Sequence, residues 1–205
     1  MSKGRVLTVL LAMMLFSLTA SAQMVKASFG VTGGGIATLM MGTEPPTSSP
    51  MYISGYGGAF ATINYGNSIG IRGGANYAMQ GSTYSLSGTT LKAAQSYIQI
   101  PVSFLWHMRS FVSLEAGFYQ NILLSSSLTE QGRSTVVISP DEGALKYNFG
   151  ALAGIEFNFG RFVFLELKYH YGLSKSYVIY GKGFPSSFAT VGLGFNLIST
   201  RKSAF

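Results

Sequence analysis

The chain has 205 residues and a formal net charge of +7, from 14 Lys and Arg against 7 Asp and Glu. Charged residues make up only 10% of it and hydrophobic residues 47%, whereas about a quarter of an ordinary soluble domain is charged. The basic residues are scattered singly, so we expect no nucleic-acid partner. Cysteine is absent, so we expect neither disulfide bonds nor an anchor on a lipid-modified cysteine.

Residues 1–22 have the pattern of a cleaved signal peptide. Lys3 and Arg5 supply positive charge, residues 6–18 form an apolar run, and Ala20 and Ala22 give the small-x-small pattern that precedes a cleavage site. The mature domain is then predicted to comprise residues 23–205. A buried N-terminal helix is the alternative interpretation of the same run.

After residue 22 no apolar run approaches the roughly 18 residues that a membrane-spanning helix needs. A chain this hydrophobic must therefore satisfy its backbone in lipid by another route. A closed β-barrel is that route, because closure leaves no unpaired strand edge.

In chain order, the sequence predicts eight strands in which apolar and polar residues alternate. They cover residues 25–39, 52–63, 68–80, 94–106, 111–124, two arms within 144–174 that a tight turn at 158–161 joins, and 187–198. In the second arm, Leu165 and Leu167 share one face, while Glu166 and Lys168 share the other. Such a strand puts apolar side chains toward lipid and polar ones toward the lumen. We predict an all-β fold, an eight-stranded antiparallel transmembrane up-and-down β-barrel. A soluble barrel or sandwich is the alternative.

The connections alternate between short turns and long polar segments. Residues 64–67, 107–110 and 158–161 form short turns, and residues 40–51, 81–93, 125–143 and 175–186 form long loops. Outer-membrane barrels have short periplasmic turns and longer extracellular loops. We therefore expect an outer-membrane location in contact with lipid and lipopolysaccharide, with both termini in the periplasm.

Several stretches carry a family likeness. They include SYIQIPVSFLW around Pro101, LEAG at residues 114–117 and ATVGLGFNL at residues 189–197. The chain resembles the PorT-like outer-membrane β-barrel family common in Bacteroidetes-type Gram-negative bacteria. The resemblance implies the same fold and location. Thr190, Gly192, Phe195 and Leu197 also look like the terminal-strand signal that the barrel-assembly machinery reads, although residues 199–205 follow it.

Charged residues on the predicted lumen faces are the main candidate site. Arg72, Glu115, Glu156, Glu166 and Lys168 occupy the polar faces of their strands, and Arg72, Glu115 and Glu166 fall at similar depth. A charge in so narrow a space costs several kcal/mol unless it is paired. We interpret the set, with the nearby His170, as a network that fills the lumen. A proton or ion path is the alternative.

Catalysis is not expected. His170 lies four residues from both Glu166 and Ser174 on one strand face, which imitates the catalytic set of a lipid-modifying enzyme. Four strand residues span about 13 Å, however, too far for a hydrogen bond. No residue spacing suggests a metal site or a cofactor site. His107 is expected to be solvated in a short turn.

Aromatic residues are predicted where the barrel meets the two membrane interfaces. They are Trp106, Tyr147, Phe157, Tyr169, Tyr171 and Phe195. The sequence thus predicts a structural or surface-interaction protein that acts through four long extracellular loops. A lipid-modifying enzyme using His170 and an accessory component of a protein secretion system are the alternatives.

Overall fold

The computed structural model describes residues 25–40, 51–86, 89–130, 136–137, 146–174, 177–179, 182–184 and 186–199. The predicted signal peptide and the segment after residue 199 lie outside these residues. Within the described ranges, no helix is long and apolar enough to cross a membrane.

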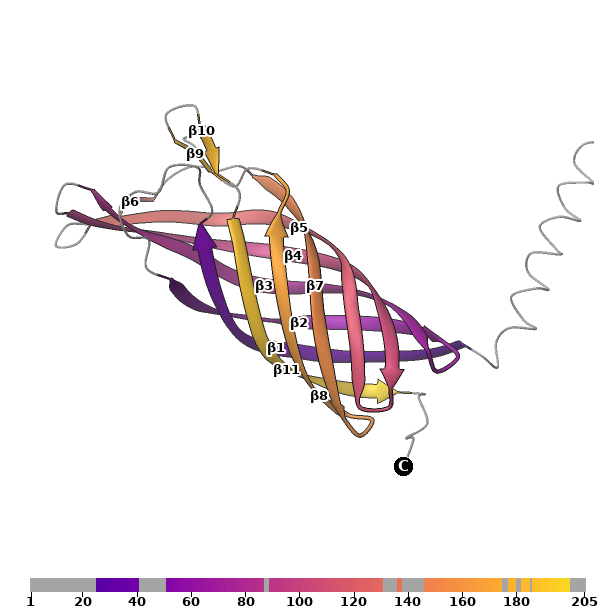
Figure 1. Cartoon of the computed structure of the whole chain (residues 1–205). Coiled ribbons are helices and arrows are strands. Elements are labelled where there is room, and N and C mark those ends of the chain that lie inside the picture. The colour runs from indigo at the N-terminus through magenta and orange to yellow at the C-terminus, as the bar shows by residue number, and fades with distance from the viewer. Residues whose placement is uncertain are drawn as a thin grey trace, which may run out of the picture.

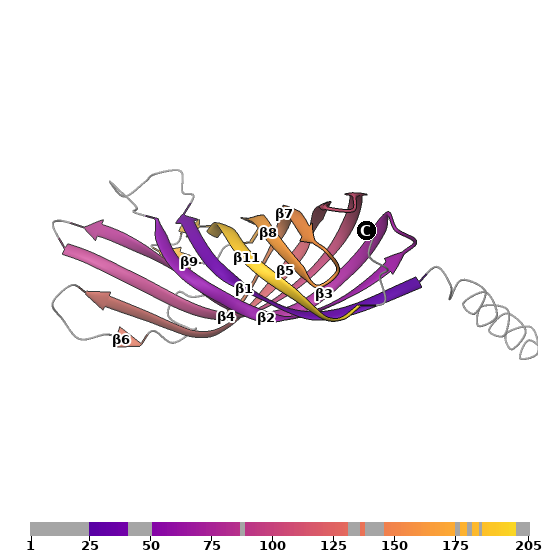
Figure 2. The same cartoon turned by 90° about the horizontal axis from the view of Figure 1, so that it is seen from below.

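Eight strands form a closed antiparallel ring (Figures 1 and 2). The ring strands are β1 (Val25–Met40), β2 (Tyr52–Tyr65), β3 (Ile69–Leu86), β4 (Thr89–Arg109), β5 (Val112–Glu130), β7 (Tyr147–Phe159), β8 (Val163–Gly172) and β11 (Ser186–Ser199). Neighbours in the chain pair with each other, and β1 pairs with β11 to close the ring. This confirms the predicted eight-stranded barrel. Outside the ring, β6 (Val136–Val137) pairs with β5, while β9 (Tyr177–Ile179) pairs with β10 (Lys182–Phe184).

Side chains alternate between the two faces of the barrel wall. In β7, Asn148 and Glu156 are buried, whereas Tyr147 and Phe149 are exposed. Many apolar side chains on the outer face are about half exposed, among them Ile71, Phe104, Trp106, Phe118, Leu167 and Leu193. The outer surface is therefore apolar and suited to lipid.

Two tight turns depend on glycine. Gly66 and Gly160 have φ values of 62° and 75°, a left-handed conformation that costs glycine little.

Pro101 interrupts the hydrogen-bond ladder between β3 and β4. Pairing of β3 with β4 is interrupted between Gly73↔Val102 and Asn76↔Gln99, because Pro101 has no N–H to donate to the ladder.

Three strands are longer than predicted. Residues 81–93 and the first part of 125–143 were expected to be loops, but β3 and β4 stay paired up to Leu86↔Thr89, and β5 continues to Glu130. Figures 1 and 2 show β3, β4 and β5 projecting beyond the other strands. The eight residues of β3 after Ala78 add about 26 Å at 3.3 Å per residue. The sequence does not indicate this extension, because polar residues occur on both of its faces and no regular alternation results.

Glycines make room for rings inside the barrel. A methyl group on Gly194 would collide with the ring of Phe164, which lies opposite it on β8, and one on Gly192 would collide with the hydroxyl of Tyr56. Toward the long-loop end, a cluster of buried side chains fills the lumen: Ile36, Ala78, Tyr119, Leu152 and Phe188. Large and small residues therefore interlock across neighbouring strands.

We predict that Gly194→Ala destabilises the barrel by about 1–3 kcal/mol, the usual cost of an overpacked core. Gly73→Ala is the matched control, because no heavy atom lies within 4 Å of the added methyl group. Urea unfolding in lipid vesicles measures both changes. Equal unfolding free energies for the two variants would show that Phe164 does not need this space.

We predict that Leu167→Arg destabilises the barrel in lipid by about 2–4 kcal/mol, because a charge near the bilayer midplane is costly. Leu167 is 43% exposed in the middle of β8. Val163→Arg, at the turn end of the same strand, should cost about 0–1 kcal/mol, as near an interface. A similar loss for both variants would contradict the depth assigned to Leu167.

Candidate functional site: the charged lumen

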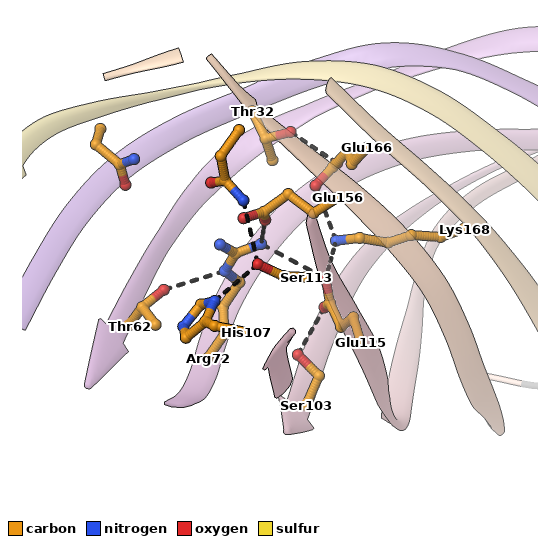
Figure 3. A network of polar contacts seen from close by, with 12 residues as sticks. Thr32, Thr62, Arg72, Ser103, His107, Ser113, Glu115, Glu156, Glu166 and Lys168 are labelled. Atoms are coloured by element: carbon orange, nitrogen blue, oxygen red, sulfur yellow. Dashed lines mark hydrogen bonds and ion pairs between the residues drawn. The ribbon is translucent and has the colours of Figure 1, made fainter. Parts of the chain in front are cut away.

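Five charged side chains from four strands meet inside the barrel (Figure 3). They are Arg72 of β3, Glu115 of β5, Glu156 of β7, and Glu166 and Lys168 of β8. Strand alternation points all five inward, and register places glycines beside three of them. Gly154 lies opposite both Glu115 and Lys168, and Gly192 lies opposite Glu166. The small neighbours leave room for long side chains.

Arg72 binds two carboxylates at once. Its Nη1 lies 2.7 Å from Glu156 Oε2 and 3.5 Å from Glu115 Oε2, and its Nε donates to Thr62 Oγ1 at 3.0 Å. The Arg72 side chain is 8% exposed. Charge-assisted hydrogen bonds of this kind are stronger than neutral ones.

Two phenyl rings enclose the same guanidinium group. The Arg72 Cζ atom lies 4.6 Å from the ring centroid of Phe60 and 4.9 Å from that of Phe164. The two rings meet edge to face, with centroids 5.5 Å apart. Each ring face attracts the cation, so Arg72 is held by aromatic contacts and by carboxylates together.

Lys168 forms the second half of the network. Its Nζ lies 2.9 Å from Glu166 Oε2 and 3.1 Å from Glu115 Oε2. Glu115 therefore contacts both cations and joins the two halves. The sequence predicted that Arg72, Glu115 and Glu166 lie at similar depth. In the structure, Arg72 pairs with Glu115 and with Glu156, whereas Glu166 pairs with Lys168.

Hydroxyl groups donate to the second carboxylate oxygens of Glu115 and Glu166. Ser103 donates to Glu115 Oε1 at 2.6 Å, while Thr32 and Tyr56 donate to Glu166 Oε1 at 2.8 and 2.5 Å. Strand alternation alone does not distinguish Thr32, Thr62 or Ser103 from the other inward-facing residues. The sequence could still have indicated these three residues, because each lies on the inward face of its strand at the depth of a charged residue.

The two cations offset the repulsion among the three carboxylates. Glu156 and Glu166 lie directly opposite each other on β7 and β8, and a like-charge cross-strand pair is destabilising. Oxygens of Glu115, Glu156 and Glu166 lie within 4.8 Å of one another, a spacing that could hold a metal ion. In the structure, Arg72 and Lys168 contact all three carboxylates. Arg72 and Lys168 thus offset most of the negative charge of three carboxylates that are almost fully buried.

The structure corrects the expectation for His107. We expected a solvated turn residue, but His107 is 8% exposed and points into the lumen near the turn end. Its Nδ1 lies 2.7 Å from Ser113 Oγ and its Nε2 lies 2.8 Å from Asn64 Oδ1. The reason is that β4 continues to Arg109, so strand alternation reaches His107.

His170 is packed among rings. It stacks on Phe188 with centroids 4.3 Å apart and meets Tyr119 edge to face at 5.1 Å. Ser174, the third member of the imitated catalytic set, uses its hydroxyl on the main chain of Phe149: it accepts from the amide at 2.7 Å and donates to the carbonyl at 3.3 Å. His170 faces the lumen, away from the lipid-facing surface.

Little free space is left around the network. One cavity of about 20 Å³ is lined by residues that include Gln99, Glu166, Lys168 and His170, and another of about 20 Å³ by residues that include Glu156. Each has room for about one water molecule. Gln99 and His170 line the first cavity, and among the described residues Gln99 Nε2 and His170 Nδ1 are two of the buried polar atoms without a hydrogen-bond partner.

The residues of the predicted assembly signal and the predicted interface aromatics lie on defined faces of the barrel wall. Thr190 and Gly192 of the predicted assembly signal are buried, while Phe195 and Leu197 are exposed on the outer face. The predicted interface aromatics lie on the outer face: Trp106, Tyr147, Tyr169, Tyr171 and Phe195 are exposed, and Phe157 is partly buried.

We predict that Arg72→Met lowers the unfolding free energy by about 3–5 kcal/mol, as when one partner of a buried network is removed. The change leaves Glu156 without the cation that it pairs with at 2.7 Å. A triple variant, Arg72→Met with Glu115→Gln and Glu156→Gln, should lose less, because it keeps the balanced Lys168–Glu166 pair. Urea unfolding in lipid vesicles tests this. A triple variant whose loss equals the sum of the three single losses would show that the residues do not act together.

The comparisons with known proteins agree with this architecture. Residues 20–178 match the family model described as outer membrane protein beta-barrel domain, and no curated protein sequence matches the chain. The crystal structure of Neisserial surface protein A is similar, with a TM-score of 0.59 and 16% identity over 83% of this chain and 99% of that one.

Two further solved structures align less well. They are the attachment invasion locus protein of Yersinia pestis, with a TM-score of 0.48 and 14% identity over 83% of this chain and 97% of that one, and outer membrane protein W of E. coli, with a TM-score of 0.44 and 12% identity over 83% and 98%. At such identities the likeness concerns the fold alone. The family match covers most of the chain, so the protein belongs to the outer membrane β-barrel family, and its place is the outer membrane.

Proposed function

We propose that the protein is a sealed outer-membrane barrel whose role is structural or interactive and lies at the cell surface, without catalysis. The observation that carries this proposal is the filled lumen. The ion network occupies its middle, and the cluster around Tyr119, Leu152 and Phe188 lies toward the long-loop end. An eight-stranded barrel has an interior just wide enough for side chains to fill.

The orientation and the finer family assignment belong to the same proposal. A cleaved signal peptide delivers the chain, the barrel-assembly machinery inserts it, and both termini stay in the periplasm. The PorT-like family of Bacteroidetes-type bacteria is supported by the stretches around Pro101 and residues 114–117. In this orientation the projecting parts of β3, β4 and β5 stand outside the cell, among lipopolysaccharide, where a protein partner can reach them.

The two alternatives have less support. The enclosure of His170 on the lumen side argues against an enzyme that acts on membrane lipid. An accessory role in protein secretion follows from the family resemblance alone.

Conductance across a planar bilayer tests the sealed barrel. We expect the purified protein to show no stable channel under conditions in which an open porin conducts. The reason is that the described cavities beside the network hold about one water each. A large and stable wild-type conductance would overturn the proposal.

Labelling of whole cells tests the orientation. The chain has no cysteine, so a single introduced thiol reports its own position. A membrane-impermeant maleimide should label Ser85→Cys at the end of β3 and spare Ser110→Cys in the turn between β4 and β5. The reverse pattern would invert the proposed topology.

A further inference from the structure

A groove crosses the outer face of the barrel wall. It has a volume of about 740 Å³ and is lined by residues of five neighbouring strands, β7, β8, β11, β1 and β2. The register places one outward residue of each strand in a single row, Ala153↔Tyr169↔Ala189↔Ala37↔Ile53. Three members of this row are alanines, so the groove lies where the wall carries small side chains.

Larger side chains border the row on the side of the short turns. Ile155, Leu167 and Val191 form the next outward row on β7, β8 and β11, and all three are exposed. Apart from the hydroxyl of Tyr169, every outward side chain that lines the groove is apolar. The groove therefore offers hydrocarbon contacts and almost no side-chain hydrogen-bonding group.

The groove lies in the part of the wall that faces the hydrocarbon of the membrane. Tyr169 is six residues from the start of β8 at Val163, and Ala153 is six residues from the end of β7 at Phe159. Six residues of a strand tilted by about 40° rise about 15 Å along the membrane normal. That is half of a hydrocarbon core about 30 Å thick, so the row lies near the middle of the bilayer.

Neither water nor empty space suits such a groove. Water is not retained at a site that offers it no polar partners. An unfilled groove loses the van der Waals contacts that its lining atoms would otherwise make. Acyl chains surround this part of the wall, so hydrocarbon fills the groove.

We propose that the groove holds one acyl chain of a membrane lipid in a fixed position, laid across the five strands. Four strand spacings of about 4.8 Å make the groove about 19 Å long. One leaflet contributes about 15 Å of hydrocarbon thickness, so an inclined acyl chain matches this length. In the groove the chain contacts both the alanine row and the bordering side chains, whereas elsewhere on a convex wall it is contacted from one side. The site does not depend on whether the lumen is sealed.

A second copy of the chain fits the groove less well. Two copies in one membrane have the same orientation, so a two-fold axis along the membrane normal would bring the same surface of each copy together. Two facing grooves would enclose a larger void, and association inside a membrane depends on close packing. A flexible acyl chain can follow the groove where a second rigid wall cannot.

Photolabelling in lipid vesicles tests the site. The probe is a phosphatidylcholine with a diazirine in the middle of one acyl chain, added at a low proportion to phosphatidylcholine vesicles that contain the purified barrel. Mass spectrometry should find several-fold more label on residues 167–169 and 189–191 than on residues 71–77 of β3, another outward wall at similar depth. Equal labelling of the two walls would show only the general lipid shell and would overturn the proposal.

Filling the groove supplies the decisive variant. Ala153→Phe combined with Ala189→Phe should lower the label on residues 167–169 to the level found on β3, because the two rings occupy the space of the chain. Ala75→Phe is the matched control: Ala75 is an exposed outward alanine, six residues from the start of β3 at Ile69, and it does not line the groove. This control should keep the wild-type labelling pattern.

Folding and association are checked on the same samples. A shift between boiled and unboiled samples on a gel shows that each variant is folded, and all three added rings face lipid, where apolar side chains are tolerated. Undiminished labelling of the groove in the double variant would contradict the fixed acyl chain. A wild-type dimer that chemical crosslinking detects and the double variant abolishes would assign the groove to a second copy and would also overturn the proposal.

Discussion

The structure depends on pairing charged side chains inside a narrow lumen that has little room for water. Three carboxylates and two cations lie within one short stretch of a narrow lumen. An isolated buried charge costs several kcal/mol, so each charged residue constrains the position of the others. Glu115 is the shared partner, because Arg72 and Lys168 both contact its Oε2. The network thereby connects β3, β5, β7 and β8 across the lumen, beyond the ladder hydrogen bonds between neighbouring strands.

The same constraint explains the distribution of glycine and aromatic residues. Long charged side chains and the rings of Phe60 and Phe164 fit only where the facing wall carries no side chain, as at Gly154 and Gly194. This packing supports the proposal that the lumen is sealed. On that proposal, function lies at the end of the barrel where β3, β4 and β5 continue past the closed ring.

The sequence predicts the barrel and its inward residues well, because alternation is a local property. It places Arg72, Glu115, Glu156, Glu166 and Lys168 on the lumen face before any contact is known. It does not identify their partners. Whether Arg72 meets Glu156 or Glu166 depends on the stagger between strands that are not neighbours, and turn lengths alone do not fix that stagger.

Other features of the structure were not predicted from the sequence, for different physical reasons. His107 was assigned to a turn because the end of β4 was placed too early, and one residue of error at a strand end changes the whole environment. The projecting parts of β3, β4 and β5 were assigned to loops because their sequences show no regular alternation of apolar and polar residues. Thr32, Thr62 and Ser103 are common small residues whose role appears only once a carboxylate or guanidinium lies beside them.

A double-mutant cycle between Arg72→Met and Lys168→Met tests most directly whether the lumen charges form one network. The two cations share Glu115 as an ion-pair partner, so we expect the effects of the two substitutions to be coupled. Unfolding free energies in lipid vesicles should deviate from additivity by about 0.5–3 kcal/mol, the range for residues in one network. Additivity within about 0.3 kcal/mol would show two independent ion pairs and contradict the account.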